Sequence, residues 1–216
     1  MIYLTQIEVP CEDVAKLCIR DHYDWHQRIW ECFPGLDGKP REYLTRIDQR
    51  GDCFRLLIVS PAKSVRPDWC PPDAWRGTKP VPEDYFNHRF YRFQLCANPT
   101  KKISVEKPGG GFTKNGRRVP LRTRDELAGW IKRKGEQGGF GIDEKSLRTL
   151  RRGAEFFMKK GTRGLLNAVE FQGILEVTDM RKFRQAFATG IGSAKAFGFG
   201  LLVLAPLPGG KRESEE

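Results

Sequence analysis

Apolar and polar positions alternate at the start of the chain and then change to a helical spacing. Residues 3–9 alternate as in a β-strand, whereas residues 21–33 repeat apolar positions at helical intervals after a predicted Asp21 N-cap. Two further strands, 43–50 and 53–60, flank a Gly-Asp pair that indicates a hairpin. The first third of the chain is therefore expected to run strand, helix, strand, strand.

A proline-rich segment follows and interrupts the periodicity. Residues 61–84 contain six prolines, so we expect any second helix there to be short or degraded. The pattern then repeats, in the order strand (89–97), glycine-rich loop, helix (123–134), basic segment (147–159), apolar run (165–177), helix (179–189) and closing strand (201–205).

Two successive β-α-β-β-α-β units describe an α+β protein with tandem ferredoxin-like (RRM-like) domains and antiparallel sheets. We expect domains at 1–86 and 87–207, and a charged, disordered tail at 208–216. No apolar segment approaches the length of a membrane span, and no targeting segment is visible. The six cysteines have irregular spacing without a C-x-x-C pair, which favours reduced, structural cysteines in the cytoplasm over a zinc site or a disulfide framework.

The net positive charge is carried by the second half of the chain. Residues 1–96 contain 14 Lys and Arg against 14 Asp and Glu, whereas residues 97–216 contain 24 against 13 and carry the whole net charge of +11. Such a local excess is the electrostatic footprint of a polyanion partner, although a solvated basic face is the simpler alternative.

Residues 190–200 form a glycine-rich segment with one lysine, Lys195, between a predicted helix and the closing strand. Glycines allow successive backbone N–H groups to converge on an anion, and the lysine adds a point charge. The helix-loop-strand order differs from the strand-turn-helix order of dinucleotide and P-loop motifs. A packing turn is the alternative interpretation.

The chain has three histidines. On the helix predicted at 21–33, His22 lies close to the apolar stripe and is interpreted as structural, whereas His26 shares a flank with Tyr23 so that both rings can point at one ligand. His88 is assigned to the domain junction or the surface. No cluster of Asp, Glu, His and Cys suggests a two-metal nuclease, and no cofactor is predicted.

Four segments of the chain occur in one characteristic order. They are the opening M-I-Y-L-T, H-Q-R-I-W at 26–30 with Phe33-Pro34 behind it, F-Q-L-C-A-N-P-T-K at 93–101, and the glycine loop with its following L-L. Together they resemble the type I-E (CasE) family of CRISPR repeat-processing endoribonucleases. The resemblance spans residues 1–207 and implies tandem ferredoxin-like domains. The catalytic histidine of the family falls on His26. Tyr23 matches a position that contributes to catalysis in some members but is not uniformly tyrosine.

The implied function is metal-independent cleavage of precursor CRISPR RNA within repeat hairpins. The substrate 2′-OH would attack, giving 5′-hydroxyl and 2′,3′-cyclic phosphate ends, and the mature RNA would be retained with other subunits of a type I-E surveillance complex in the cytoplasm. A-form RNA is read mainly through phosphates, shape and 2′-OH groups. We therefore predict RNA contacts from the basic half, at Lys101, Lys102, Arg117, Arg118, Arg148, Arg151, Arg152, Gly190, Gly192 and Lys195.

Two other function classes stay open on the sequence alone. A non-catalytic RNA-hairpin-binding module would explain the charge and the aromatic-basic strand at 89–93, but it gives His26 no role. A small-molecule phosphate enzyme that uses the glycine loop leaves the charge excess unexplained.

Overall fold

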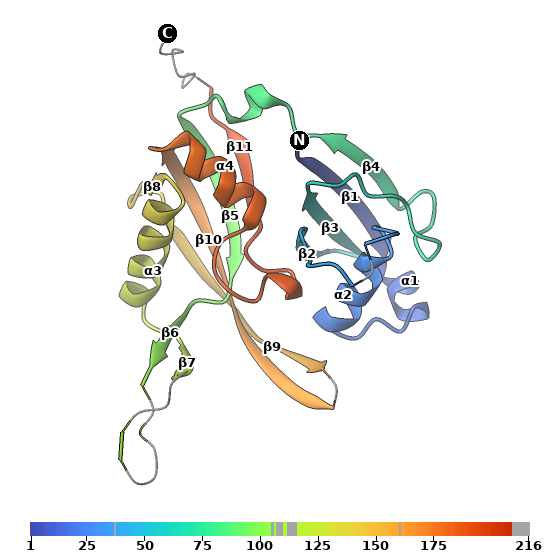
Figure 1. Ribbon diagram of the computed structural model, residues 1–216, viewed down its shortest axis with the longest axis horizontal. Coiled ribbons are helices and arrows are strands. Elements are labelled where there is room, and N and C mark those ends of the chain that lie inside the picture. Colours follow the sequence, from blue (N-terminus) through green and yellow to red (C-terminus); the bar gives the residue numbers. More distant parts are fainter. Residues whose placement is uncertain (37, 105, 107–109, 112–115, 160, 209–216) are drawn as a thin grey trace.

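The chain forms two sheet-based units side by side (Figure 1). The computed structural model describes residues 1–208 except for 37, 105, 107–109, 112–115 and 160. The predicted tail, apart from Pro208, lies outside the described residues. No helix in the described part of the chain is long and apolar enough to cross a membrane.

The first unit is a four-stranded antiparallel sheet in the order β2-β3-β1-β4. It consists of β1 (Tyr3–Pro10), α1 (Cys11–Lys16), α2 (His22–Trp30), β2 (Leu44–Arg50), β3 (Cys53–Ser60) and β4 (Trp75–Pro80). The predicted strands and the predicted helix are confirmed, with α2 ending slightly earlier than expected. The helix-poor segment is also confirmed, since residues 61–74 contain no helix.

The fourth strand and the short helix α1 were missed. β4 lies at the edge of the sheet, where Pro80 costs no ladder hydrogen bond. Gly77 has a positive φ and lies opposite the register shift in β1. A strand with a bulge and a terminal proline has little alternation for a sequence pattern to reveal.

Both faces of the first sheet are covered. In β3, Leu56 and Ile58 pack beneath α2, whereas Leu57 and Val59 point the other way and join the core of the second unit. All four side chains are buried. The unbroken apolar run 56–59 is what a strand buried on both faces requires.

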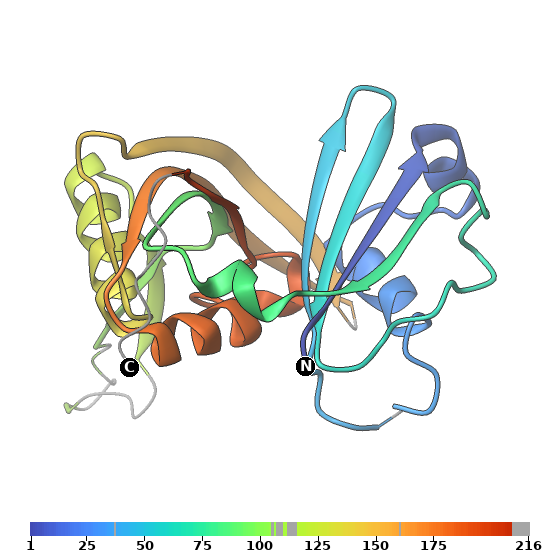
Figure 2. The same cartoon turned by 90° about the horizontal axis from the view of Figure 1, so that it is seen from above.

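The second unit has the same strand order, with β11 (Leu202–Pro206), β5 (Phe90–Ala97), β10 (Thr162–Val177) and β8 (Phe140–Ile142) side by side. The helices α3 (Arg124–Gln137) and α4 (Met180–Thr189) lie on one face of this sheet (Figure 2). Both begin at predicted positions, because Thr123 and Asp179 accept hydrogen bonds from first-turn amides. The tandem ferredoxin-like class is confirmed. The 3₁₀ turn η1 (Glu83–Phe86) connects the two sheets, and the domain limits at 1–86 and 87–207 stay a prediction.

Two strand pairs extend beyond this second sheet. β6 (Thr100–Ile103) and β7 (Arg117–Pro120) form a small separate hairpin that the sequence reading did not predict. β9 (Arg148–Lys159) pairs with β10, and the ends of both strands run past β5 toward α2 as a ribbon (Figures 1 and 2). We call residues 153–159 and 161–167 of this pair the β9–β10 ribbon.

Candidate active site and RNA-binding surface

The helix α2 presents His26 between two aromatic rings. Asp21 caps the helix, its Oδ1 accepting from the amides of Tyr23 (2.8 Å) and Asp24 (3.0 Å). The rings of Tyr23 and His26 lie 6.3 Å apart between centroids, as the spacing predicts. One turn later, Trp30 Nε1 donates to His26 Nε2 at 3.3 Å. The indole therefore orients a half-buried imidazole, while Tyr23 lies beside it.

His22, one turn before His26, joins the two units. Its Nε2 lies 2.5 Å from Glu155 Oε2 on the β9–β10 ribbon, and its ring is 5.8 Å from that of Phe199. Asp21 Oδ2 accepts from the amide of Met158 on the same ribbon at 2.9 Å. The structural interpretation of His22 is supported, and the ribbon is seen to dock on the N-terminal end of the helix that carries His26.

A buried charge network forms a second connection between the units. Asp48 accepts from Arg46 (2.8 Å), Arg55 (2.9 Å) and Arg152 (3.2 Å), and Arg46 also donates to Glu170 (2.9 Å). Burial alone would raise the pKa of Asp48, but hydrogen bonds and charges from Arg46 and Arg55 outweigh it and lower the pKa to about 2. Sequence analysis missed this network, because ion pairs between residues more than 100 positions apart leave no local pattern.

The glycine loop 190–200 packs against the first unit. Its 3₁₀ turn, η2 (Lys195–Phe197), contacts α2 and β2, and Phe197 lies over Phe157 of the ribbon at 4.2 Å between centroids. A Cβ on Gly190 would lie 2.7 Å from Leu44 Cδ2, and one on Gly192 would lie 3.1 Å from the Trp130 ring.

Both glycines of this predicted anion site also have positive φ, so packing and backbone conformation alone require them. In addition, the amides of Ile191 and Gly200 donate to protein carbonyls rather than standing open. The structure therefore gives the loop a packing role that the sequence reading had kept as the alternative. Contacts of Gly190 and Gly192 with RNA stay a prediction.

Lys195 lies at the junction of the units. Its Nζ donates to the carbonyl of Thr189 at 2.7 Å. Burial, followed by the neighbouring charges of Arg41 and Lys134, lowers its pKa. It makes no ion pair with any described residue, so its charge is available to a phosphate.

The β6–β7 hairpin collects four of the predicted RNA-binding residues. Lys102 pairs across the strands with Arg118, next to Arg117, and these side chains are exposed. Lys101 also projects to the surface, but its Nζ donates to Glu126 at 2.8 Å. The sequence analysis grouped these cations without predicting the hairpin that brings them together, and their contacts with RNA stay a prediction.

The three predicted arginines of β9 have different surroundings. Arg151 is exposed, and Arg148 donates to the carbonyls of Lys145 and Leu147. Arg152 instead pairs with the buried Asp48 and Glu170, which gives it a structural role that the sequence reading did not foresee. Across the described part of the chain, no three His, Cys, Asp or Glu side chains gather in a metal-binding arrangement.

The fold places the chain among tandem ferredoxin-like proteins, and its second half carries the basic excess that is typical of a polyanion partner. The family model described as "CRISPR associated protein" matches residues 2–206, and the chain belongs to that family. The resemblance found in the sequence is thereby confirmed.

Two curated relatives match nearly the whole chain. The CRISPR-associated endoribonuclease Cse3 of Thermus thermophilus is 33% identical over 224 residues, covering 95% of this chain and 100% of the relative. The CRISPR system Cascade subunit CasE of Escherichia coli is 29% identical over 196 residues, covering 90% and 96% respectively. Among solved structures, Thermus thermophilus Cse3 bound to an RNA representing a pre-cleavage complex superposes with a TM-score of 0.72 at 26% identity, covering 95% of this chain and 99% of that one.

Proposed function

We propose that this protein is an endoribonuclease that cleaves precursor CRISPR RNA within repeat hairpins. The observation that carries the proposal is His26, which Trp30 orients and Tyr23 flanks on α2. The 3₁₀ turn of the glycine loop contacts the same helix. The relative Cse3 is named an endoribonuclease and has been solved with RNA, which supports the same substrate class here.

The chemistry needs few protein groups, because the substrate supplies the nucleophile. The 2′-oxygen attacks the adjacent phosphorus, the P–O5′ bond breaks, and the products are a 2′,3′-cyclic phosphate and a 5′-hydroxyl. One proton leaves the 2′-OH and one is delivered to the 5′-oxygen. An imidazole near neutral pH can serve in either transfer, and such a step contributes roughly 10²–10⁴ in rate. We assign one transfer to His26 and leave Tyr23 as the neighbouring candidate.

Substrate binding is assigned to the second unit. Exposed cations on β6–β7 and β9, together with Lys195, form a basic surface for the phosphates of an RNA duplex. CasE is named a subunit of Cascade, and we propose that this protein likewise retains its product within a type I-E surveillance complex in the cytoplasm.

The test is cleavage of a cognate repeat hairpin in the presence of excess EDTA, with analysis of the product ends. We expect a single cut that leaves a 5′-hydroxyl and a 2′,3′-cyclic phosphate. A matched RNA with a 2′-deoxy nucleotide before the cut should bind equally well and remain intact. A strict requirement for divalent metal would exclude this mechanism.

The same experiment distinguishes the endoribonuclease from a protein that binds RNA without cutting it. Tight binding of the hairpin without any cut product, across repeats of different sequence, would instead identify a non-catalytic RNA-binding module.

A further inference from the structure

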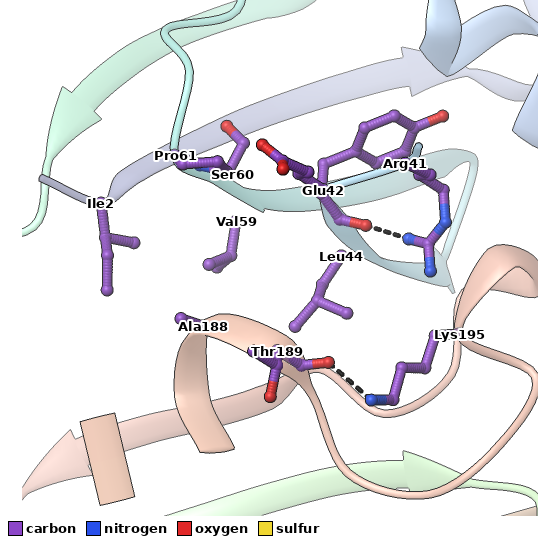
Figure 3. A pocket seen from close by; sticks show the side chains of 11 residues that line it. Ile2, Arg41, Glu42, Leu44, Val59, Ser60, Pro61, Ala188, Thr189 and Lys195 are labelled. Carbon is purple, nitrogen blue, oxygen red and sulfur yellow. Dashed lines mark hydrogen bonds between the residues drawn. The ribbon is translucent and has the colours of Figure 1, made fainter. Parts of the chain in front are cut away.

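A pocket of about 530 Å³ lies between the two units, and Lys195 is one of the residues that line it (Figure 3). Its walls come from the start of β1, the β2–β3 pair, the end of α4 and the glycine loop. Much of the lining is apolar, and Figure 3 shows Leu44 and Val59 pointing from the β2–β3 pair toward the end of α4. Ile2, Pro61 and Ala188 complete the apolar lining. An apolar pocket of several hundred Å³ with a few polar groups is typical of a site for a small organic group.

Two cations stand on one side of this pocket. Arg41 donates to the carbonyl of Tyr43, and Lys195 donates to that of Thr189. Neither forms an ion pair with a carboxylate among the described residues. Burial lowers the pKa of both groups, and the charge of Arg41 lowers that of Lys195 further. Two neighbouring, partly buried positive charges favour an anion between them.

The polar groups of the pocket also fit a nucleobase. Glu42 lines the space, and Figure 3 shows its carboxylate turned away from the guanidinium of Arg41. A carboxylate in that place can accept an N–H from the amino group of a base. The pocket thus combines an apolar floor, an acceptor and a pair of cations, which matches the base and phosphate of one nucleotide.

The pocket is connected to His26 through aromatic contacts. Trp30 donates to His26, and its ring packs edge-on against Tyr43 at 5.2 Å between centroids. The carbonyl of Tyr43 in turn holds Arg41. His26 and this pocket therefore lie on opposite sides of the Trp30–Tyr43 ring pair, since Tyr43 lines the pocket and Trp30 contacts His26.

We infer that this pocket binds one unpaired nucleotide of the substrate RNA close to the cleaved bond, its base against Leu44 and Val59 and its phosphate between Arg41 and Lys195. The inference rests on the proposed function and adds a base-binding subsite to it.

The test combines a pocket-filling substitution with removal of single bases. Ala188→Phe, on the partly exposed end of α4, fills the pocket without altering either cation. Repeat RNAs are prepared with one abasic residue at each unpaired position around the cut, and their dissociation constants are measured. We expect one position at which loss of the base weakens wild-type binding by about 5- to 100-fold. Ala188→Phe should weaken binding of intact RNA similarly and show no further loss with that abasic RNA.

Matched controls keep the result specific. Ala15→Phe places the same ring on the exposed face of α1 and should bind every RNA like the wild type. Arg41→Ala should weaken binding of the RNA at the same nucleotide that the abasic series identifies. Arg50→Ala, which removes an exposed arginine of β2, should not weaken it. Arg41→Ala also covers the case in which Ala188→Phe fails to fold.

Normal binding of intact RNA by both Ala188→Phe and Arg41→Ala, or additive losses at every abasic position, would overturn the inference. Wild-type cleavage of unmodified RNA tests the proposed function separately. If the wild type cleaves normally but the losses from Ala188→Phe and from the abasic position simply add, only the pocket proposal is eliminated. If the two losses do not add but the wild type never cleaves, only the nuclease activity is eliminated.

Discussion

The two units share one strand order but cover their sheets differently. The first sheet is buried on both faces, under α2 on one side and against the second unit on the other. The second sheet is covered by α3 and α4 on one face. Its opposite face is buried around Cys96 and Glu170, where the first unit meets it, whereas Arg92 and Gln172 on that face stand exposed. A sheet buried on both sides has its accessible groups on helices and edges, which is where His26 lies. A sheet with a partly open face has room for a polar partner.

Charge follows the same division. The first 96 residues are balanced in charge, and the excess of bases begins where the second unit begins. The comparison suggests that one unit supplies the proton-transfer group and the other holds the polyanion.

The largest expected effect comes from removing the imidazole of the first unit. His26→Ala should slow single-turnover cleavage by roughly 10²–10⁴, because the variant loses one of the two proton transfers that the reaction needs. Binding of the uncut hairpin should stay near the wild-type level, since the cations lie elsewhere. His88→Ala removes a histidine at the junction of the units and serves as the control. An unchanged cleavage rate in His26→Ala would remove this residue from the active site.

The connection between the units is tested through its buried carboxylate. Asp48→Ala leaves Arg46, Arg55 and Arg152 without their shared acceptor. Because this leaves the largely buried Arg55 without a carboxylate and takes one of two carboxylates from the buried Arg46, the free energy of unfolding should fall by about 3–5 kcal/mol in urea titrations. Asp52→Ala, at the exposed turn between β2 and β3, is the matched control. A loss below about 1 kcal/mol would show that the network contributes little beyond a surface ion pair.

The smallest effect concerns the charge of the second unit. The double substitution Lys102→Ala and Arg118→Ala should weaken hairpin binding and make the plot of log affinity against log salt shallower by about one for each lost phosphate contact. Cleavage of bound RNA should be preserved. Arg50→Ala, in the charge-balanced unit, should leave the slope as it is. Equal slopes for all three proteins would place the RNA away from the β6–β7 hairpin.

The sequence predicted the elements whose signals are local. Asp21 and Asp179 marked helix starts through side-chain capping, and the Gly-Asp pair marked the first hairpin. The neighbouring positions of Tyr23 and His26 also followed directly from helical spacing. Local chemistry was therefore enough to place the candidate catalytic pair.

Features that depend on distant residues were not predictable in the same way. One partner of Asp48, Arg152, lies more than 100 residues away in the sequence. Glu155 reaches His22 only because the β9–β10 ribbon crosses between the units. The glycine loop was read as an anion site, yet the contact of Gly190 with Leu44 shows how close packing selects the same residue type. Composition alone cannot separate these two requirements.

The carboxylate of Asp21 has a consequence for any attempt to divide or recombine this protein. One of its oxygens caps α2, and the other accepts from Met158 of the second unit. A first unit produced alone, or joined to the second unit of a relative with a shorter ribbon, would lose a hydrogen bond at the start of the helix that carries His26. Chimeras should therefore exchange the β9–β10 ribbon and α2 together, so that the hydrogen bond between Asp21 and Met158 is kept.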